Sequence, residues 1–176
     1  MIALPNYADI NGRPMKKLQI QQYLRKLQLN DFEPAVNLAT LTKLQDAHLK
    51  YIPYENFDCL NGKITSLKRQ DMFNKVIMHN RGGICFELNG LYNWLLESLG
   101  FDVTSYSARF IDKMETYQLR RHRVMCVALG DKRYLTDVGV NSESPRVPLE
   151  ITEGLIQSDG ISQYKFTRSE FWGWLL

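Results

Sequence analysis

The hydrophobic pattern of this chain changes its period at Gly100. Before Gly100, apolar residues recur every three or four positions, which is the spacing of a helix with one buried face. After Gly100, the apolar runs are short and alternate with polar residues, which is typical of strands. Helices followed by strands predict an α+β fold.

Four helices are expected before this change. The clearest begins at Cys85 or Phe86 and ends at Leu99, because it carries a broad apolar stripe and Gly100 is the residue expected to end it. The other three cover residues 17–27, 37–51 and 66–78. Asn37 is the expected N-cap of the second of these helices.

Strands are expected at residues 103–111, 121–129, 133–138 and 161–167. Gly130 and Asp131 form the expected turn between the second and the third. The chain then finishes in an apolar run from Phe171 to Leu176. We expect this run either to fold back on the domain or to mediate a homodimer, because so many apolar side chains are unfavourable in water.

Composition excludes several classes of protein. Of the 176 residues, 23% are charged and 44% are hydrophobic, so the chain is not disordered and is long enough for one domain, with or without a small helical subdomain. The net charge of +3 is too small and too evenly spread to predict binding to nucleic acid or to a membrane surface. The N-terminal residues lack the pattern of a secretory signal, and we expect a cytoplasmic protein.

The three cysteines, Cys59, Cys85 and Cys126, are odd in number and widely spaced. They fit neither a disulfide framework nor a zinc site, so we expect free thiols and no bound metal. Cys85 differs from the other two because it follows two glycines and opens a predicted helix. Unpaired backbone N–H groups and the positive end of the helix dipole favour a reactive thiolate there, although a small buried core cysteine is the alternative.

A nucleophilic cysteine needs a base, and the base needs a group that orients it. His48 lies on a largely apolar helix face and is expected to be packed in the core or an interface, and His79 lies at a helix end. His122 lies in a predicted strand and shares a face with Val124 and Cys126, whereas Arg121 and Arg123 occupy the opposite face. We therefore take His122 as the candidate base, against the alternative of a satisfied core histidine.

Asp137 is the candidate orienting group. It lies at the end of the predicted strand 133–138, where a carboxylate needs a partner if it is buried. A two-residue turn at Gly130 and Asp131 would set Asp137 opposite Val124 and diagonal to His122. The pattern alone thus gives a modest argument for the set Cys85, His122 and Asp137.

Three ordered motifs resemble one known family. The run RGGICFELN, from Arg81 to Asn89, is similar to the signature of the arylamine N-acetyltransferases. The run HLKYIPYEN, which begins at His48, resembles another segment of that family, and so does Asp137-Val138-Gly139, which begins fifteen residues after His122. The resemblance covers residues from about 20 to about 167.

The resemblance implies a fold and a division into domains. Residues 1–84 would form a helical bundle, and residues 85–176 would form the catalytic helix and an antiparallel β-barrel-like domain, around a Cys-His-Asp core like that of cysteine proteases. The family continues into a C-terminal α/β lid, which would be absent from a chain of this length. Such truncation implies weak turnover.

The resemblance also implies a reaction. Cys85 would take the acetyl group of acetyl-CoA as a thioester, His122 would activate the thiol, and Asp137 would orient the imidazole. The acetyl group would then pass to an arylamine or arylhydrazine in a double-displacement cycle. No metal takes part in such a reaction.

Further positions match the family. Glu55 and Arg81 would pair and hold the loop before Cys85, although a surface ion pair of little value is the alternative. Tyr54, Gly139 and Val140 would belong to the pocket for substrate or coenzyme, with Tyr54 and Val140 in places where the family usually has phenylalanine. Asn141 replaces a family glycine and would obstruct the coenzyme.

Arg120, Arg121 and Arg123 surround His122 and could attract phosphates, but a solvated strand edge is the favoured interpretation. A guanidinium close to His122 would disfavour its imidazolium form. Two other functions stay open. One is a catalytically silent relative that serves as a binding module or is a remnant, and the other is a thiol hydrolase or transglutaminase-like enzyme with the same three residues.

Overall fold

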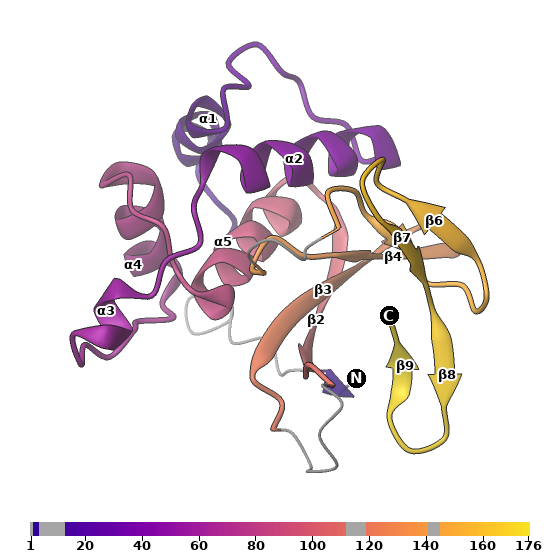
Figure 1. Cartoon of the computed structure of the whole chain (residues 1–176). Helices are drawn as coiled ribbons and strands as arrows, with labels where there is room; N and C mark the ends of the chain where they lie inside the picture. The colour runs from indigo at the N-terminus through magenta and orange to yellow at the C-terminus, as the bar shows by residue number, and fades with distance from the viewer. Residues whose placement is uncertain (1, 4–12, 112–118, 141–144) are drawn as a thin grey trace.

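The computed structural model describes residues 2–3, 13–111, 119–140 and 145–176. A layer of helices covers one face of an antiparallel sheet, and two short hairpins lie beyond the other face (Figure 1). The α+β fold expected from the change of period is therefore confirmed.

Three of the four predicted helices are present within one residue of the expected ends. They are α1 (Lys17–Lys26), α2 (Leu38–Tyr51) and α5 (Cys85–Ser98). Asn37 is the N-cap of α2, as predicted, because its side-chain oxygen accepts a hydrogen bond of 2.8 Å from the Thr40 backbone N–H.

The fourth predicted helix, at residues 66–78, differs from the expectation. It consists of α4 (Arg69–Phe73) and a π-helical turn, η2 (Asn74–Met78), so it begins three residues late and widens halfway. A short helix, α3 (Phe57–Leu60), was not predicted because four residues show no period. The wider turn sets Lys75 against α5, where its ammonium group bonds Glu87.

The main sheet has five strands in the order β1-β2-β3-β4-β5, and every neighbouring pair is antiparallel. Two separate two-stranded sheets follow along the chain. The strands are β1 (Ile2–Ala3), β2 (Asp102–Ala108), β3 (His122–Leu129), β4 (Lys132–Thr136), β5 (Leu149–Glu150), β6 (Ile156–Ser158), β7 (Gln163–Lys165), β8 (Thr167–Ser169) and β9 (Gly173–Leu175).

The expectation of a barrel needs correction. Among the described residues, β1 and β5 are edges of the main sheet, and the hairpins β6–β7 and β8–β9 pair only within themselves. The sheet is therefore open. Strands of two or three residues cannot supply the continuous ladder that closure requires. The predicted boundary between domains at residue 84 stays a prediction.

The hairpin between β3 and β4 has the predicted register. Leu129 pairs with Lys132 across a two-residue turn, and Met125 pairs with Thr136 at the far end. Asp137 is thus the first residue beyond the ladder. The turn chemistry of Gly130 and Asp131 alone was enough to fix this register.

Alternation along β3 divides its side chains between two cores. Met125 and Val127 join the main core with the helices, while Val124 joins a smaller cluster with Leu135 and Phe166 on the other face. His122 lies on the same face as Val124, as predicted, and both residues line the same cavity.

The apolar run at the C-terminal end folds back as the hairpin β8–β9. The ring of Trp174 packs edge-on against buried Phe166, with 6.2 Å between the ring centroids. The run therefore docks on the domain, which was the first of the two expectations. Homodimerisation through this region stays a prediction.

Candidate active site

Cys85 is the first residue of α5, and its side chain is buried. The thiol donates a long hydrogen bond of 3.7 Å to the Arg121 backbone carbonyl, which is the residue before β3. The approach to this helix needs glycine, because a Cβ at Gly82 would overlap the Pro53 carbonyl oxygen. The two glycines before Cys85 thus allow the tight turn that the sequence suggested.

His122 and Asp137 make the short contact at the centre of the site. His122 Nε2 lies 2.6 Å from Asp137 Oδ2, and both side chains are buried. This contact occupies one ring nitrogen and leaves Nδ1 for another partner. The structure therefore brings together the predicted base and the predicted orienting carboxylate.

The environment of His122 stabilises its charged form. Burial lowers the pKa of His122, but hydrogen bonds to Asp137 and Cys85 and the charges of both partners outweigh burial and raise it from 6.5 to about 9. At neutral pH the ring is then an imidazolium beside the Cys85 thiol. An imidazolium next to a thiol favours the thiolate, which is the nucleophilic form of cysteine.

The expectations about the flanking arginines were partly wrong. Arg123 is not on a solvated edge but is buried against the helical layer, where its guanidinium donates to the Ser105 hydroxyl at 2.8 and 3.2 Å. Burial lowers the pKa of Arg123 to about 10. The pKa of His122 is raised rather than lowered, because the effects of Asp137 and Cys85 prevail.

Asn89 was part of the quoted motif, but sequence reasoning gave it no role. It lies on α5 one turn after Cys85, fully buried, and its side-chain amide donates to Asp137 Oδ1 at 2.8 Å. Its carbonyl oxygen accepts from the Val138 backbone N–H at 2.9 Å. A polar residue within the apolar stripe of a helix was the signal that could have identified it.

Gly139 lets the end of β4 approach the start of α5. A Cβ at Gly139 would lie 2.6 Å from the Asn89 amide nitrogen and 2.7 Å from the Cys85 Cα. Its backbone N–H also donates to Asp137 Oδ1 at 2.8 Å. A side chain at this position would push the carboxylate away from the helix that carries the cysteine.

A second buried amide, that of Gln45 on α2, bonds the chain both before and after Asp137, at Thr136 and at Pro145. Its oxygen accepts from the Thr136 hydroxyl at 2.6 Å, and its nitrogen donates to the Pro145 carbonyl at 2.6 Å. The helical layer therefore fixes the residue that precedes Asp137. The sequence offered no signal for this contact, since the partners are 91 and 100 positions away.

The ion pair predicted between Glu55 and Arg81 is present, with 2.7 and 2.9 Å between guanidinium nitrogens and Glu55 Oε1. It is one part of a larger network. Asp58 accepts from Arg81 at 3.3 Å and from Lys75 at 2.9 Å, and Lys75 also bonds Glu87. Hydrogen bonds from Lys75, which have the largest effect, and from Arg81 outweigh desolvation and lower the pKa of Asp58 to about 2.

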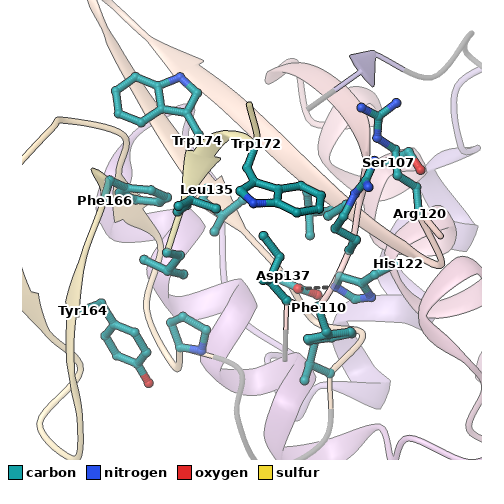
Figure 2. A pocket seen from close by; sticks show the side chains of 18 of the residues that line it. Ser107, Phe110, Arg120, His122, Leu135, Asp137, Tyr164, Phe166, Trp172 and Trp174 are labelled. Atoms are coloured by element: carbon teal, nitrogen blue, oxygen red, sulfur yellow. Dashed lines mark hydrogen bonds and ion pairs between the residues drawn. The ribbon is translucent and has the colours of Figure 1, made fainter. Parts of the chain in front are cut away.

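A cavity of about 860 Å³ opens beside His122 and Asp137. Figure 2 shows Trp172 over the His122–Asp137 pair and Phe110 beside it, and the Phe110 and His122 rings have centroids 5.2 Å apart. Phe166 and Trp174 form a further part of the wall. Aromatic walls with a few convergent polar groups are typical of small-molecule sites.

The predicted pocket residues are divided by the structure. Val140 lines the cavity, whereas Tyr54 and Gly139 are not among the described residues that line it. Tyr54 instead forms an isolated parallel β-bridge with Gly83, and the residue is 40% exposed. Asn141, which was expected to obstruct the coenzyme, lies outside the described residues.

The described part of the chain offers neither a cluster of metal ligands nor a membrane-spanning helix. No group of three or more histidine, cysteine, aspartate or glutamate side chains there could hold a metal ion. No helix within those ranges is long and apolar enough to cross a membrane.

Comparison with known proteins agrees with this geometry. Residues 37–176 match the family model described as N-acetyltransferase. The chain belongs to the arylamine N-acetyltransferase family. It is 36% identical over 152 residues to the arylamine N-acetyltransferase of Mycolicibacterium smegmatis. The aligned residues cover 83% of this chain and 55% of that protein. It is 33% identical over 132 residues to the enzyme of Escherichia coli strain K12, with 74% and 47% covered.

Solved structures of the family have the same fold. The arylamine N-acetyltransferase from Salmonella typhimurium superposes with a TM-score of 0.83 and 26% identity, over 92% of this chain and 62% of that one. The chain therefore spans about half to two thirds of the length of the family members it matches.

Proposed function

We propose that this chain catalyses the acetyl-CoA-dependent N-acetylation of arylamines and arylhydrazines through an acetyl-cysteine at Cys85. The observation that carries the proposal is the 2.6 Å contact of His122 with Asp137, next to a cysteine that opens a helix. Membership of the arylamine N-acetyltransferase family supports the choice of acetyl donor and acceptor. The reaction would take place in the cytoplasm and needs no metal.

In the first half of the cycle, the Cys85 thiolate attacks the thioester carbonyl of acetyl-CoA. A carbon–sulfur bond to Cys85 forms as the bond to the coenzyme sulfur breaks, and the His122 imidazolium gives its proton to the departing coenzyme thiolate. Asp137 keeps the ring oriented through Nε2, so Nδ1 is the nitrogen that serves Cys85.

In the second half, the amine attacks the acetyl-cysteine. The now neutral His122 accepts a proton from the amine nitrogen, the amide bond forms, and Cys85 leaves as the thiolate. Covalent catalysis is advantageous because it splits one difficult acyl transfer into two steps, each with a lower barrier. The aromatic wall formed by Phe110 and Trp172 is suited to a flat acceptor ring.

The direct test is mass spectrometry of the intact protein after incubation with acetyl-CoA. We expect one added acetyl group, located on the peptide that contains Cys85, and none in a Cys85→Ala variant. Cys126→Ala is the matched control and should still be acetylated. Absence of an adduct in the wild-type protein would contradict the proposal and favour the silent relative that serves as a binding module.

A second assay follows transfer to a simple arylamine or arylhydrazine. Loss of the adduct on adding the amine, with appearance of the acetylated amine, supports the double-displacement cycle. Loss of the adduct to water alone would instead favour a thiol hydrolase. The same assay tests the prediction of weak turnover, which stays a prediction.

A further inference from the structure

A buried carboxylate lies in the first turn of the helix that Cys85 opens. Glu87 is only 2% exposed, and its Oε2 accepts a hydrogen bond of 2.9 Å from the backbone N–H of Ile84, the residue before Cys85. This bond satisfies one of the donors that a helix leaves unpaired at its start. Glu87 therefore fixes the turn that presents Cys85.

The same carboxylate creates an electrostatic difficulty. A buried negative charge this close to Cys85 disfavours a second negative charge on its sulfur, because like charges repel more strongly where water is excluded. A cysteine that must act as a thiolate would then lose reactivity. The contact with Ile84 is useful for geometry but unfavourable for chemistry unless the charge is balanced.

Lys75 supplies that balance from a different element. Its Nζ donates to Glu87 Oε1 at 2.8 Å and to Asp58 Oδ2 at 2.9 Å, and its side chain is 18% exposed. Lys75 is in the π-helical turn η2, the part of the chain that sequence reasoning predicted as an ordinary helix. The widened turn is thus where an ammonium group meets the first turn of α5.

Lys75 is held in its charged form. Burial, the largest single contribution, lowers the pKa of Lys75, but hydrogen bonds and charge interactions with Glu87 and Asp58 together raise it above its ordinary value. The lysine therefore stays protonated across the neutral range. Gly83 packs closely against this carboxylate, because a Cβ at Gly83 would lie 2.9 Å from Glu87 Oε2.

We propose that Lys75 is a positioning residue for the nucleophile, which holds Glu87 on the Ile84 N–H and neutralises its charge so that Cys85 can ionise. This inference rests on the proposed function in taking Cys85 as the nucleophile. It adds a requirement that lies outside the Cys-His-Asp set, because Lys75 belongs to η2 and not to the helix that carries Cys85.

Other ionisable groups also act on Cys85 and must be separated from Lys75. His122 hydrogen-bonds with Cys85 and is paired with Asp137, while Tyr54 and Arg123 interact with it through charge. Arg81 contacts Asp58, the other partner of Lys75. None of these groups bonds Glu87 among the described residues, so changes at positions 75 and 87 isolate the pair.

The experiment measures how fast iodoacetamide alkylates Cys85, by peptide mass spectrometry, from about pH 5 to about pH 9. In Lys75→Met, Glu87 lacks its cation, and we expect the half-maximal pH to rise by about one unit and the rate near pH 7 to fall about tenfold. The double variant Lys75→Met with Glu87→Gln keeps an oxygen for Ile84 but removes the charge. It should recover to within about threefold of the wild-type rate.

Two further variants keep the test decisive. Glu87→Gln alone leaves Lys75 without an opposing charge on α5, and Cys85 should react at least as fast as in the wild type. Lys75→Arg retains the charge and should keep the wild-type half-maximal pH. If Lys75→Met does not fold, the double variant and Glu87→Gln still test whether the Glu87 charge matters.

A purely structural role would lower stability but leave the pH profile unchanged, and that result would overturn the inference. Failure of the double variant to recover, with its fold intact, would also overturn it. Alkylation does not depend on acetyl transfer. Thus an unreactive Cys85 in the wild-type protein, or the absence of an acetyl adduct, counts against the proposed function, whereas a wild-type profile in Lys75→Met counts against this inference alone.

Discussion

His48 and His122 are both buried, yet their surroundings drive their charge in opposite directions. His48 lies in the helical layer between Tyr23 and Tyr92, with ring centroids 6.0 and 5.4 Å away, and neither ring nitrogen has a hydrogen-bond partner within the described part of the chain. Burial lowers the pKa of His48 to about 3. His122 is also buried but faces a carboxylate at 2.6 Å, and its pKa rises to about 9.

Burial sets the energetic cost of charging a histidine, and a carboxylate partner decides whether its pKa is raised or lowered. A buried histidine without a partner stays neutral and packs like an aromatic residue, whereas one with a carboxylate stays an imidazolium. Both histidines lie in segments that resemble family motifs. The contacts in three dimensions give the physical reason for the distinction that the sequence predicted between a packed His48 and the candidate base His122.

The largest effect should come from making His122 resemble His48. Asp137→Asn removes the carboxylate, so the imidazolium is no longer stabilised and the ring can adopt the wrong tautomer. We expect acetyl transfer to fall about a thousandfold or more, and alkylation of Cys85 near neutral pH to fall as well. Asp131→Asn, in the exposed turn between β3 and β4, is the matched control and should react like the wild type. A wild-type rate in Asp137→Asn would break the comparison.

Contacts of this site between residues close in the sequence could be predicted, whereas contacts between distant segments could not. The register of β3 with β4 follows from a two-residue turn, so the meeting of His122 with Asp137 was predictable from local chemistry. The burial of Arg123 was not, because alternation identifies two faces of a strand but not which face the helices will cover. The open sheet and the cavity wall made by β8–β9 depend on contacts between short strands with no strong pattern of their own.

The next effect concerns stability and pH. The folded-state pKa of His48, about 3, is below its ordinary value of 6.5, so the unfolded chain binds a proton that the folded chain does not. Stability should therefore fall as pH drops below 6.5, by about 3 kcal/mol at a pH of about 4.5. His48→Leu removes this contribution, and urea unfolding of both proteins across this range measures it. Equal pH slopes for the two proteins would contradict the lowered pKa.

His122 should show the opposite sign in the same experiment. Its folded-state pKa, about 9, lies above 6.5, so its contribution is fully present below pH 6.5 and is lost as pH rises through about 9. The loss is at most about 3 kcal/mol. His122→Gln should flatten the alkaline side of the stability curve and leave the acid side as in the wild type. If His122→Gln changed the stability curve only at acid pH, the carboxylate of Asp137 would not be what raises the pKa of His122.

A smaller effect is expected at the amide that holds the carboxylate. Asn89→Ala leaves Asp137 Oδ1 with the Gly139 N–H as its remaining described partner, so the carboxylate can turn away from His122. Alkylation of Cys85 should fall about thirtyfold. Asn93→Ala is the matched control, because Asn93 is buried on the same helix but bonds Glu97 and Ser105. Similar losses of reactivity in the two variants would mean that α5 packing, not the carboxylate, is responsible.

The smallest effect should come from Arg81→Gln. Its ion pair with Glu55 is partly exposed to solvent, so water and salt weaken the interaction, and Lys75 still holds Asp58. Alkylation of Cys85 should slow no more than about threefold, and added salt should reduce the difference. A loss comparable to that in Asp137→Asn would place this loop among the determinants of the site.

The two hydrogen bonds of Gln45 have a consequence for how the protein is made. They join α2 to Thr136 and Pro145, so they can form only after the ribosome has released the chain beyond position 145. A nascent chain that ends near position 120 already carries Cys85 and its helix, but not the residues proposed as base and carboxylate. During synthesis the thiol therefore lacks the partners proposed to activate it until the sheet has been completed against the helical layer.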